Sequence, residues 1–563
     1  MTAPFLHSLS SPWSQHILFE KLSLVKFNTF NRFKMTGLRS FLGATLTLGF
    51  LCTVCAQMPL FSTETGYDLI FSPAESAQRQ LSWLNLARQN GVDAPEGVEN
   101  CSPIGSYMVI REGTTFPSEA ETMSLNSLQQ RMRSQPINSA LRYLNQVPDS
   151  RLPMNMAGKL SEAGRQEMKM IAMRLKSRFT ELFSGPDIDL SLFNFQSMNT
   201  NASIESAVAF VQGLVGENQI CETISMEKNV TVNCQENPRT TRFPTPTSAY
   251  IPNQPIFMDP LLRPYFTRRN CLNVANKGRT NREVRAFQMG REMEQLKQKI
   301  VTKFTPPQAQ PWNITQSEVQ LLSKICGFHN ALFKDNSTWC QLFAYEDLNV
   351  AEYERELQHY WDESYGFPVN SRVACPLIND TFEYLERFTA RSPSPILPVM
   401  SIKFADENTL LRLISLLGIK RDQQQLAANN YARNRNREFR SAKMAPFAGN
   451  LAINLFRCQE TGGIFFSDQT YRVNVMLNER PINVTYCPNG LCDINVFKNG
   501  FMKQAGQCMV DKECHRAMGL GPTGGGGNGG GKRGAASSFA QSPPNVFFVL
   551  AAIVTAKIGY GGL

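Results

Sequence analysis

Apolar residues recur at helical spacing in some stretches of the chain and form short continuous runs in others. The clearest helical period lies between residues 161 and 184, where apolar side chains fall every three or four positions. Ser161 precedes them and is a residue type that caps helices. The same period predicts further helices at 203–215, 283–301, 346–362, 378–390 and 408–417. The short apolar runs predict strands at 107–110, 396–404, 451–456 and 471–477.

The order of these elements predicts the class of fold. Strands that alternate with helices indicate an α/β protein, in which helices cover a sheet. A helix-rich stretch at about 220–370 interrupts the alternation and predicts an inserted helical subdomain. We therefore expect the main folded domain at 57–515, with an α/β core and a helical insertion.

The first 56 residues have the pattern of an extension followed by a secretory signal peptide. Residues 41–54 are apolar, follow Arg39 and lead into the small-residue cleavage pattern Val54-Cys55-Ala56. The signal begins well if translation starts at Met35. If residues 1–34 are also translated, the apolar run could instead stay uncleaved as an anchor.

The C-terminal end is built differently. Residues 516–545 are rich in glycine and predict a flexible linker. Small residues, a polar spacer and an apolar tail at 546–563 then follow in the order of a GPI-anchor signal. Lys557 interrupts that tail, so a plain disordered tail is the alternative. The expected location is the secretory pathway and then the extracellular space or the cell surface.

Cysteine usage points to the same compartment. Fourteen cysteines are present, and twelve remain beyond residue 56. An even number of widely spread cysteines indicates disulfides, and these twelve include no C-x-x-C pair for a metal. Glycosylation sequons stand at Asn201, Asn229, Asn313, Asn336, Asn379 and Asn483. We expect an oxidised glycoprotein without a bound metal or cofactor.

The net charge does not favour a nucleic-acid partner. The formal charge is +10, and the first 56 residues carry five basic residues against Glu20, so processing leaves +6. That surplus is mild for so large a chain. One basic cluster, Arg433, Arg435, Arg437 and Arg440, is expected on a solvated helix or loop face.

Several segments resemble one enzyme family. Val109 begins V-I-R-E-G-T-T-F-P, where histidine acid phosphatases carry R-H-G-x-R-x-P after a strand. Further matches, in the family's order, are G-K-L-S-E-A-G-R-Q-E-M from Gly158, A-F-V-Q-G-L from Ala209, L-Q-H-Y-W-D-E-S-Y-G-F from Leu357, N-S-R-V-A-C from Asn370, A-P-F-A-G-N-L from Ala445 and V-M-L-N-E from Val475. The chain thus resembles the histidine acid phosphatase family, in its multiple inositol polyphosphate phosphatase branch, over roughly residues 100–515. This resemblance implies a parallel sheet core flanked by helices, with a helical cap beside the site.

The resemblance also implies a chemistry. In this family a histidine attacks phosphorus, arginines clamp the phosphoryl oxygens, and a second histidine binds the phosphate. A carboxylic acid protonates the leaving group. The family reaction is hydrolysis of phosphomonoesters such as inositol hexakisphosphate and 2,3-bisphosphoglycerate.

This sequence departs from the family at almost every catalytic position. Arg111 keeps the first arginine. Aligned on the motifs, the replaced positions are Glu112 for the nucleophile, Thr115 and Ala202 for two arginines, Asp406 for the second histidine and Asn408 for the acid of this branch. Other branches place their acid at the position of Glu407. Of the five histidines, His329, His359 and His515 lie beyond the signal segment but outside both motifs, and we expect each to be a satisfied or surface residue.

Three functions follow from these replacements. The first is a pseudophosphatase that binds an unknown extracellular ligand or protein, with Arg111 paired internally to Glu112 or Asp406. The second is an active phosphomonoesterase that uses Glu112 or Asp406 as a carboxylate nucleophile. The third is a pocket that binds a cation through Glu112, Asp406 and Glu407. For the first, inositol polyphosphate is a doubtful ligand because the pocket has gained carboxylates.

The resemblance implies four disulfides, Cys101 with Cys458, Cys271 with Cys375, Cys326 with Cys340 and Cys508 with Cys514. Cys221 with Cys234 and Cys487 with Cys492 are then left as local pairs. A glycan on Asn201 would stand at the mouth of the family's phosphate pocket.

Overall fold

We describe a computed structural model of the chain. The described residues are 60–72, 75–76, 101–146, 151–183, 190–216, 219–226, 229–236, 247–254, 261–262, 269–336, 338–389, 399–459, 469–487, 490–506 and 508. The signal segment, the glycine-rich linker and the apolar tail predicted above lie outside these residues. Within the described part, no helix has the length and apolar character that a membrane crossing requires.

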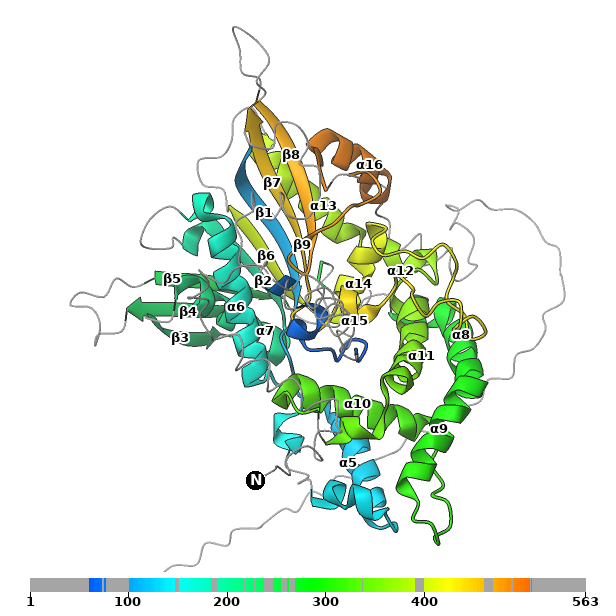
Figure 1. Cartoon of the computed structure of the whole chain (residues 1–563). Helices are drawn as coiled ribbons and strands as arrows, with labels where there is room; N and C mark the ends of the chain where they lie inside the picture. Colours follow the sequence, from blue (N-terminus) through cyan, green and yellow to red (C-terminus); the bar gives the residue numbers. More distant parts are fainter. Residues whose placement is uncertain are drawn as a thin grey trace, which may run out of the picture.

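A ten-stranded sheet forms the centre of the molecule (Figure 1). Its strands follow the order β10-β8-β7-β1-β6-β2-β5-β4-β3, and β9 pairs with β8. The strands are β1 (Cys101–Arg111), β2 (Phe193–Met198), β3 (Gln219–Met226), β4 (Asn229–Glu236), β5 (Thr247–Gln254), β6 (Met400–Ala405), β7 (Asn450–Gln459), β8 (Gln469–Leu477), β9 (Arg480–Pro481) and β10 (Leu491–Asp493). The central strands β1, β6, β2 and β5 are parallel, and antiparallel strands extend the sheet on both sides. The α/β prediction is confirmed, and the sheet is mixed.

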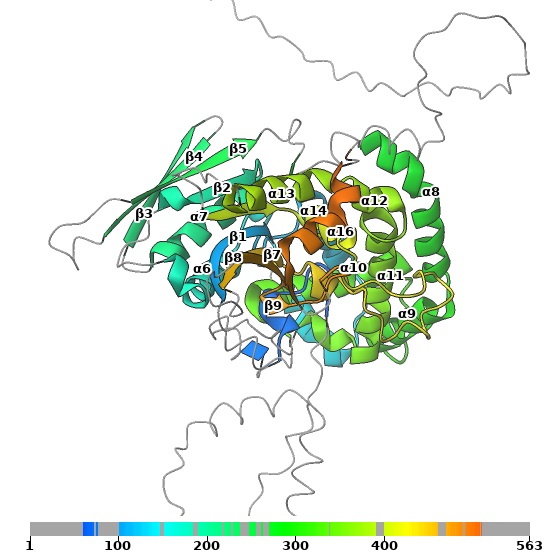
Figure 2. The same cartoon turned by 90° about the horizontal axis from the view of Figure 1, so that it is seen from above.

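Alternate residues of β1 enter two different cores, because successive side chains of a strand point to opposite faces. Met108 and Ile110 pack with helices α6 (Glu162–Arg178) and α7 (Asn201–Val215) on one face. Tyr107 and Val109 pack on the other face. That second face is covered by α13 (Cys375–Thr389), α14 (Glu407–Leu416) and α16 (Ile494–Gly506), as the view from above shows (Figure 2).

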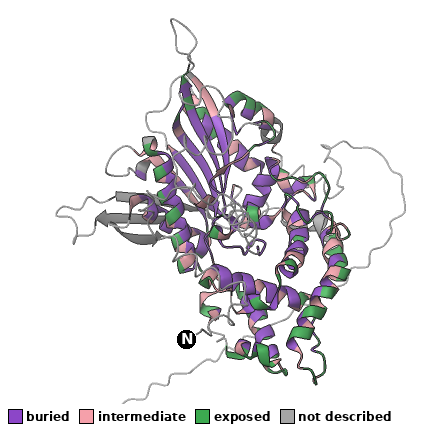
Figure 3. Ribbon diagram, viewed as in Figure 1, coloured by how far each residue is buried: buried purple, intermediate pink, exposed green. Residues whose placement is uncertain are grey.

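A helical cap lies at one end of the sheet. Its helices are α5 (Glu119–Arg133), α8 (Arg269–Gln288), α9 (Arg291–Phe304), α10 (Gln316–Phe333) and α11 (Tyr345–Glu363), followed by the short α12 (Pro368–Arg372). These helices bury one side and expose the other, whereas the sheet strands described at side-chain level are mostly buried (Figure 3). The short helix α15 (Ser441–Met444) lies near the point where cap and sheet meet (Figure 1).

The helical insertion begins later than predicted. Residues 219–254 form β3, β4 and β5, which extend the sheet, so the helical part starts at Arg269 rather than near residue 220. The single helix predicted at 283–301 is also two helices, because the chain turns at Gly290 between α8 and α9. Ser161 caps α6 as predicted, since its side chain accepts a hydrogen bond from the Gly164 amide.

Four disulfides are described. Cys101 pairs with Cys458, Cys326 with Cys340 and Cys487 with Cys492, as predicted. Cys375 pairs with Cys508, so the predicted Cys271–Cys375 and Cys508–Cys514 pairs are wrong. The reason is packing: α13, which begins at Cys375, contacts α16, which ends just before Cys508. Cys221 and Cys234 face each other across β3 and β4, as their predicted pairing requires.

Candidate functional site

The candidate site begins where β1 ends. The Arg111 amide donates to the Gly449 carbonyl at 2.7 Å, and Arg111 lies opposite Ala405 at the end of β6. Because β1 and β6 are parallel, their carboxyl ends open at the same edge of the sheet, where ligands of α/β proteins bind. The residues that follow these two strands therefore come together, as the motifs predicted.

The guanidinium of Arg111 is held by the protein itself. Its Nη1 donates to the Thr63 carbonyl at 2.5 Å and to the Ala445 carbonyl at 2.9 Å. Its Cζ lies 4.4 Å from the centre of the Phe447 ring. Its Nε lies 3.6 Å from Oε2 of Glu407, which is an ion pair but too long for a hydrogen bond. Arg111 is thus internally paired, and the carboxylate is that of Glu407 rather than the predicted Glu112 or Asp406.

Glu112, which the motifs predict at the family's nucleophile position, is half-buried. Its amide donates to the Ala405 carbonyl at 3.1 Å, and its side chain accepts from Ser203 Oγ at 3.3 Å. Burial raises the pKa of Glu112 to about 8 against the attraction of Arg111, and the nearby carboxylates of Glu407 and Asp406 add to the increase. Near neutral pH this side chain is mostly a neutral acid.

The start of α14 places the second group of predicted residues. Asp406 is the N-cap, because its side chain accepts from the amide of Thr409 at 2.9 Å and from its hydroxyl at 2.8 Å. Glu407 and Asn408 follow in the first turn and are half-buried. A carboxylate at a helix N-terminus satisfies free amides and suits the helix dipole. The residue in the histidine position therefore has a structural task.

The loop after Glu112 is rigidly packed. Glu167 accepts from the amide of Thr114 at 2.8 Å and from its hydroxyl at 2.9 Å. The Gly113 amide donates to Ser206 Oγ at 3.1 Å, and a Cβ on Gly113 would lie 2.5 Å from the Gly164 carbonyl oxygen. Only glycine can take so close an approach to α6.

The two lost arginine positions border the same loop. Thr115 is half-buried and pairs through its backbone with Leu160. Ala202 is 7% exposed in the first turn of α7. Asn201 beside it is exposed, so the predicted sequon faces solvent at this edge. Small uncharged side chains thus occupy both places where the motifs predict the family's arginines.

A segment that the sequence did not single out completes the site. Thr63 bonds to Arg111, and its Oγ1 lies 3.5 Å from Nε2 of His359 on α11. Nδ1 of His359 lies 3.3 Å from Oε2 of Glu363. Burial lowers the pKa of His359 to about 4 and raises the pKa of Glu363 to about 8. The match L-Q-H-Y-W from Leu357 was the only signal that could have pointed to this histidine.

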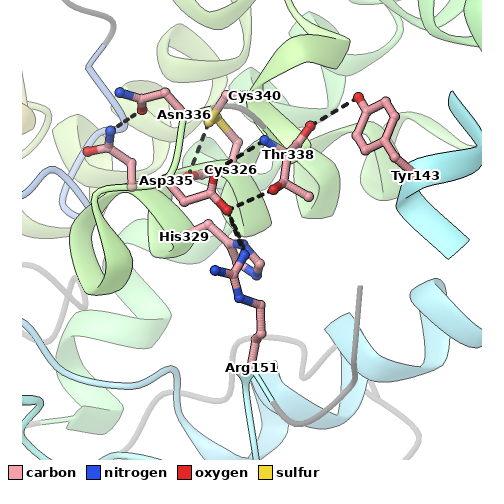
Figure 4. The surroundings of a disulfide bond; sticks show 9 residues. Tyr143, Arg151, Cys326, His329, Asp335, Asn336, Thr338 and Cys340 are labelled. Atoms are coloured by element: carbon pink, nitrogen blue, oxygen red, sulfur yellow. Dashed lines mark hydrogen bonds and ion pairs between the residues drawn. A yellow bond between two sulfur atoms is a disulfide. The ribbon is translucent and has the colours of Figure 1, made fainter. Parts of the chain in front are cut away.

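His329 lies elsewhere and is a satisfied core residue, as predicted. Figure 4 shows Arg151 and His329 turned toward Asp335 near the Cys326–Cys340 disulfide. Nδ1 of His329 lies 3.7 Å from Asp335 Oδ2 and 3.5 Å from Arg151 Nη1. Burial and the charge of Arg151 lower the pKa of His329 to about 4. The remaining histidine, His515, lies outside the described residues.

The carboxylates near Arg111 do not form a metal site. Among the residues that the structure describes, no three His, Cys, Asp or Glu side chains are placed to bind a metal ion. Glu112 meets Ser203, Asp406 caps α14, and Glu407 faces Arg111. Each of these three carboxylates thus has a partner within the protein.

Comparison with known proteins agrees with this architecture. The profile of the histidine phosphatase superfamily (branch 2) matches residues 104–478. Multiple inositol polyphosphate phosphatase 1 of Homo sapiens is 26% identical over 473 residues, which cover 82% of this chain and 89% of the relative. The same enzyme of Gallus gallus is 28% identical, over 68% of this chain and 77% of the relative.

Solved structures share the fold. The phytase from D. castellii superposes with a TM-score of 0.58 at 15% identity, covering 81% of this chain and 93% of the phytase. The Bifidobacterium longum multiple inositol polyphosphate phosphatase, in complex with inositol hexasulfate, gives a TM-score of 0.53 at 15% identity, over 75% and 92% of the two chains. At this identity the likeness concerns the fold alone. Since the profile matches well over half of this chain, the chain belongs to the histidine phosphatase superfamily (branch 2).

Proposed function

We propose that this protein is a pseudophosphatase, which keeps the phosphatase fold and acts by binding a ligand or partner rather than by hydrolysis. The observation that carries the proposal is the contact between Glu407 and Arg111. The one arginine left from the family's phosphate clamp faces an internal carboxylate and two backbone carbonyls. An incoming phosphate would have to displace these partners.

Electrostatics supports the same conclusion. Two unit charges of like sign at 4 Å repel by about 4 kcal/mol at an effective dielectric constant of 20. A substrate phosphate beside Arg111 would approach Glu407, and the charge of Asp406 reaches the same place, since both carboxylates help to raise the pKa of Glu112. The replaced arginine positions, Thr115 and Ala202, offer no compensating charge.

The alternative of a carboxylate nucleophile receives less support. Such a nucleophile must be ionised, whereas the pKa of Glu112 is raised to about 8 by burial. Asp406 is ionisable but its side chain is engaged as the cap of α14. His359 is a neutral imidazole at neutral pH, yet it contacts Thr63 rather than Arg111.

We further propose that the protein is secreted and held at the cell surface. The N-terminal signal pattern and the C-terminal anchor pattern motivate this location. The described disulfides suit an oxidising compartment. The sequon residues Asn201, Asn313 and Asn483 are exposed, as carriers of glycans must be. Flow cytometry of tagged cells before and after phosphatidylinositol-specific phospholipase C tests the anchor, and an unchanged surface signal would contradict it.

A phosphatase assay tests the central proposal. The secreted chain is incubated with inositol hexakisphosphate and with 2,3-bisphosphoglycerate, beside the human relative as the active reference. We expect no phosphate release above background. A matched variant restores the family residues through Glu112→His, Thr115→Arg, Ala202→Arg and Asp406→His. Because each such group contributes about 10²-fold or more, we expect measurable turnover from it.

Two outcomes would contradict the proposal. One is turnover by the unaltered chain comparable to the human relative. The other is a phosphoenzyme trapped from labelled substrate that disappears in Glu112→Gln, which would establish the carboxylate nucleophile. Failure of the restored variant alone is judged only after its thermal unfolding matches that of the parent chain.

A further inference from the structure

A second cleft lies in the helical cap, away from Arg111. It has a volume of about 590 Å³. It is lined by the segment 420–443, by the start of α11 and by the first half of α9. We call it the cap cleft and define it by Lys299, Lys420, Arg435, Arg437, Arg440 and Lys443, its six cationic lining residues. Its volume lies within the range of small-molecule pockets in proteins.

Positive charge gathers on one wall of the cap cleft. Lys420, Arg435, Arg437, Arg440 and Lys443 all come from the segment 420–443. The carboxylates that line the cleft are Glu292, Glu346, Asp347 and Glu438. Glu438 is bonded by Lys420 at 2.8 Å, and Asp347 by Lys299 at 2.6 Å on the opposite wall. Four cations of the lining then remain, Arg435, Arg437, Arg440 and Lys443, beside the two carboxylates Glu292 and Glu346.

One buried carboxylate holds two of these arginines in place. Glu352 on α11 is 2% exposed, and both Arg440 and Arg437 contact its Oε2. Glu356, one turn further along α11, also acts on Arg437 and Arg440 from behind the wall. Arg437 is 7% exposed, contrary to the predicted solvated face, and its Nη2 lies 3.3 Å from Glu352 Oε2. Arg437 is therefore turned inward to Glu352, whereas Arg435 and Lys443 on the same wall are exposed.

The charges around Lys443 indicate where an anion would sit. Burial lowers the pKa of Lys443, and the neighbouring cations Arg440, Lys420 and Arg480 lower it further, against the attraction of Glu352. Lys443 is exposed despite this repulsion, so its ammonium is reachable from the cleft. An anion bound there would relieve the repulsion among these four cations.

We propose that the cap cleft is a second binding site, which takes the phosphate group of a small phosphorylated molecule between Lys443, Arg440 and Arg435. Arginine and lysine in combination bind phosphate through charge-assisted hydrogen bonds. Arg111 does not line the cleft, and the proposal does not rest on the proposed function.

Isothermal titration of the full secreted chain with inorganic pyrophosphate tests this site. The informative variant is the double substitution Arg435→Ala and Lys443→Ala, because both side chains are exposed. The matched control is Arg457→Ala with Lys159→Ala, which removes one exposed arginine and one exposed lysine far from the cleft in sequence. We expect the dissociation constant to rise about tenfold or more in the cleft variant and less than about twofold in the control.

Three results would overturn the proposal. They are an absence of pyrophosphate binding to the unaltered chain, equal weakening in both double variants, and full binding by the cleft variant, which would move the site elsewhere, including to Arg111. Thermal unfolding of each variant is compared first, so that loss of binding is not confused with loss of folding. Arg440 is left unchanged because Glu352 ties it to the fold.

Discussion

Two buried clusters of arginine and glutamate in this protein are built very differently. On the α6 face of the sheet, Glu479 accepts hydrogen bonds from Arg174 at 2.7 and 2.9 Å, from Arg178 at 3.1 Å and from the Tyr67 hydroxyl at 3.0 Å. Its side chain is 1% exposed. At the candidate site, Glu407 is 27% exposed and reaches Arg111 only at 3.6 Å.

The difference separates an ion-pair cluster whose carboxylate is fully hydrogen-bonded from one whose ion pair is incomplete. Buried charges are stable only when they are paired and hydrogen-bonded, and the carboxylate of Glu479 meets that demand fully. Arg111 leaves its Nε without a hydrogen bond among the described residues. We infer that Arg111 was placed for a ligand, and that Glu407 is an imperfect substitute for it.

The largest effect is expected from breaking the saturated cluster. Glu479→Gln leaves Arg174 and Arg178 buried without a counter-charge, which we expect to cost about 3–5 kcal/mol in the free energy of unfolding. Glu205→Gln is the matched control, because its pair with Arg165 is partly exposed and should cost less than about 1 kcal/mol. Urea unfolding measures both. Equal losses would remove the contrast between buried and exposed pairs.

A smaller effect is expected at Asp406. Asp406→Ala removes the cap of α14 and should lower the free energy of unfolding by about 1 kcal/mol. Asp406→Asn keeps an acceptor for the Thr409 amide and should stay close to the parent protein. The same urea experiment measures both variants. A large loss in Asp406→Asn would mean that the charge matters beyond capping.

Glu112 should make stability depend on pH. Its pKa is about 8 in the folded protein against 4.5 in its ordinary state, so the folded state keeps a proton that the unfolded state loses above pH 4.5. The contribution of Glu112 to the free energy of unfolding is fully present below pH 4.5 and declines as the pH rises toward 8. Glu112→Gln removes this loss of stability. The melting temperature of the variant minus that of the parent should therefore be larger at pH 8 than at pH 5. A constant difference between the two pH values would contradict the assigned pKa.

The smallest change in stability is expected at Glu407. Glu407→Gln should alter the free energy of unfolding by less than about 0.5 kcal/mol, because Glu407 is 27% exposed, its contact with Arg111 is too long for a hydrogen bond, and Arg111 keeps two backbone carbonyl acceptors. The same variant should bind inorganic phosphate more tightly than the parent, which titration calorimetry detects. If Glu407→Gln instead destabilises the protein as strongly as Glu479→Gln, the two clusters contribute equally to stability and the contrast between them is lost.

Much of the fold was predictable because it depends on local patterns and on a family resemblance. The cap of Ser161, the strand after Cys101 and the helix after Asp406 all have signals within a few residues. The strands at 219–254 were missed because a hairpin at the sheet edge lacks the long apolar runs of central strands. The sheet was predicted to be parallel and is mixed. The direction of a strand depends on partners far along the chain, which local patterns do not show.

The site was predictable in its position and less so in its contacts. Arg111, Glu112 and Asp406 meet as the motifs require. Thr63 and His359 could not be placed there, because their approach depends on how the N-terminal segment and α11 pack in three dimensions. The Cys375–Cys508 disulfide has the same explanation, since spacing alone cannot choose among partners.

The position of β1 also has a consequence for biosynthesis. Among the described residues it is the first strand of the sheet but lies between β6 and β7, so its neighbours emerge from the ribosome late. Almost three hundred residues separate Arg111 from Met400, and at 5–20 residues per second their translation takes roughly 15 to 60 s. Throughout that time Tyr107 to Ile110 stay unpaired, and Cys101 waits still longer for Cys458. Chains terminated before β7 should therefore be held by chaperones and degraded.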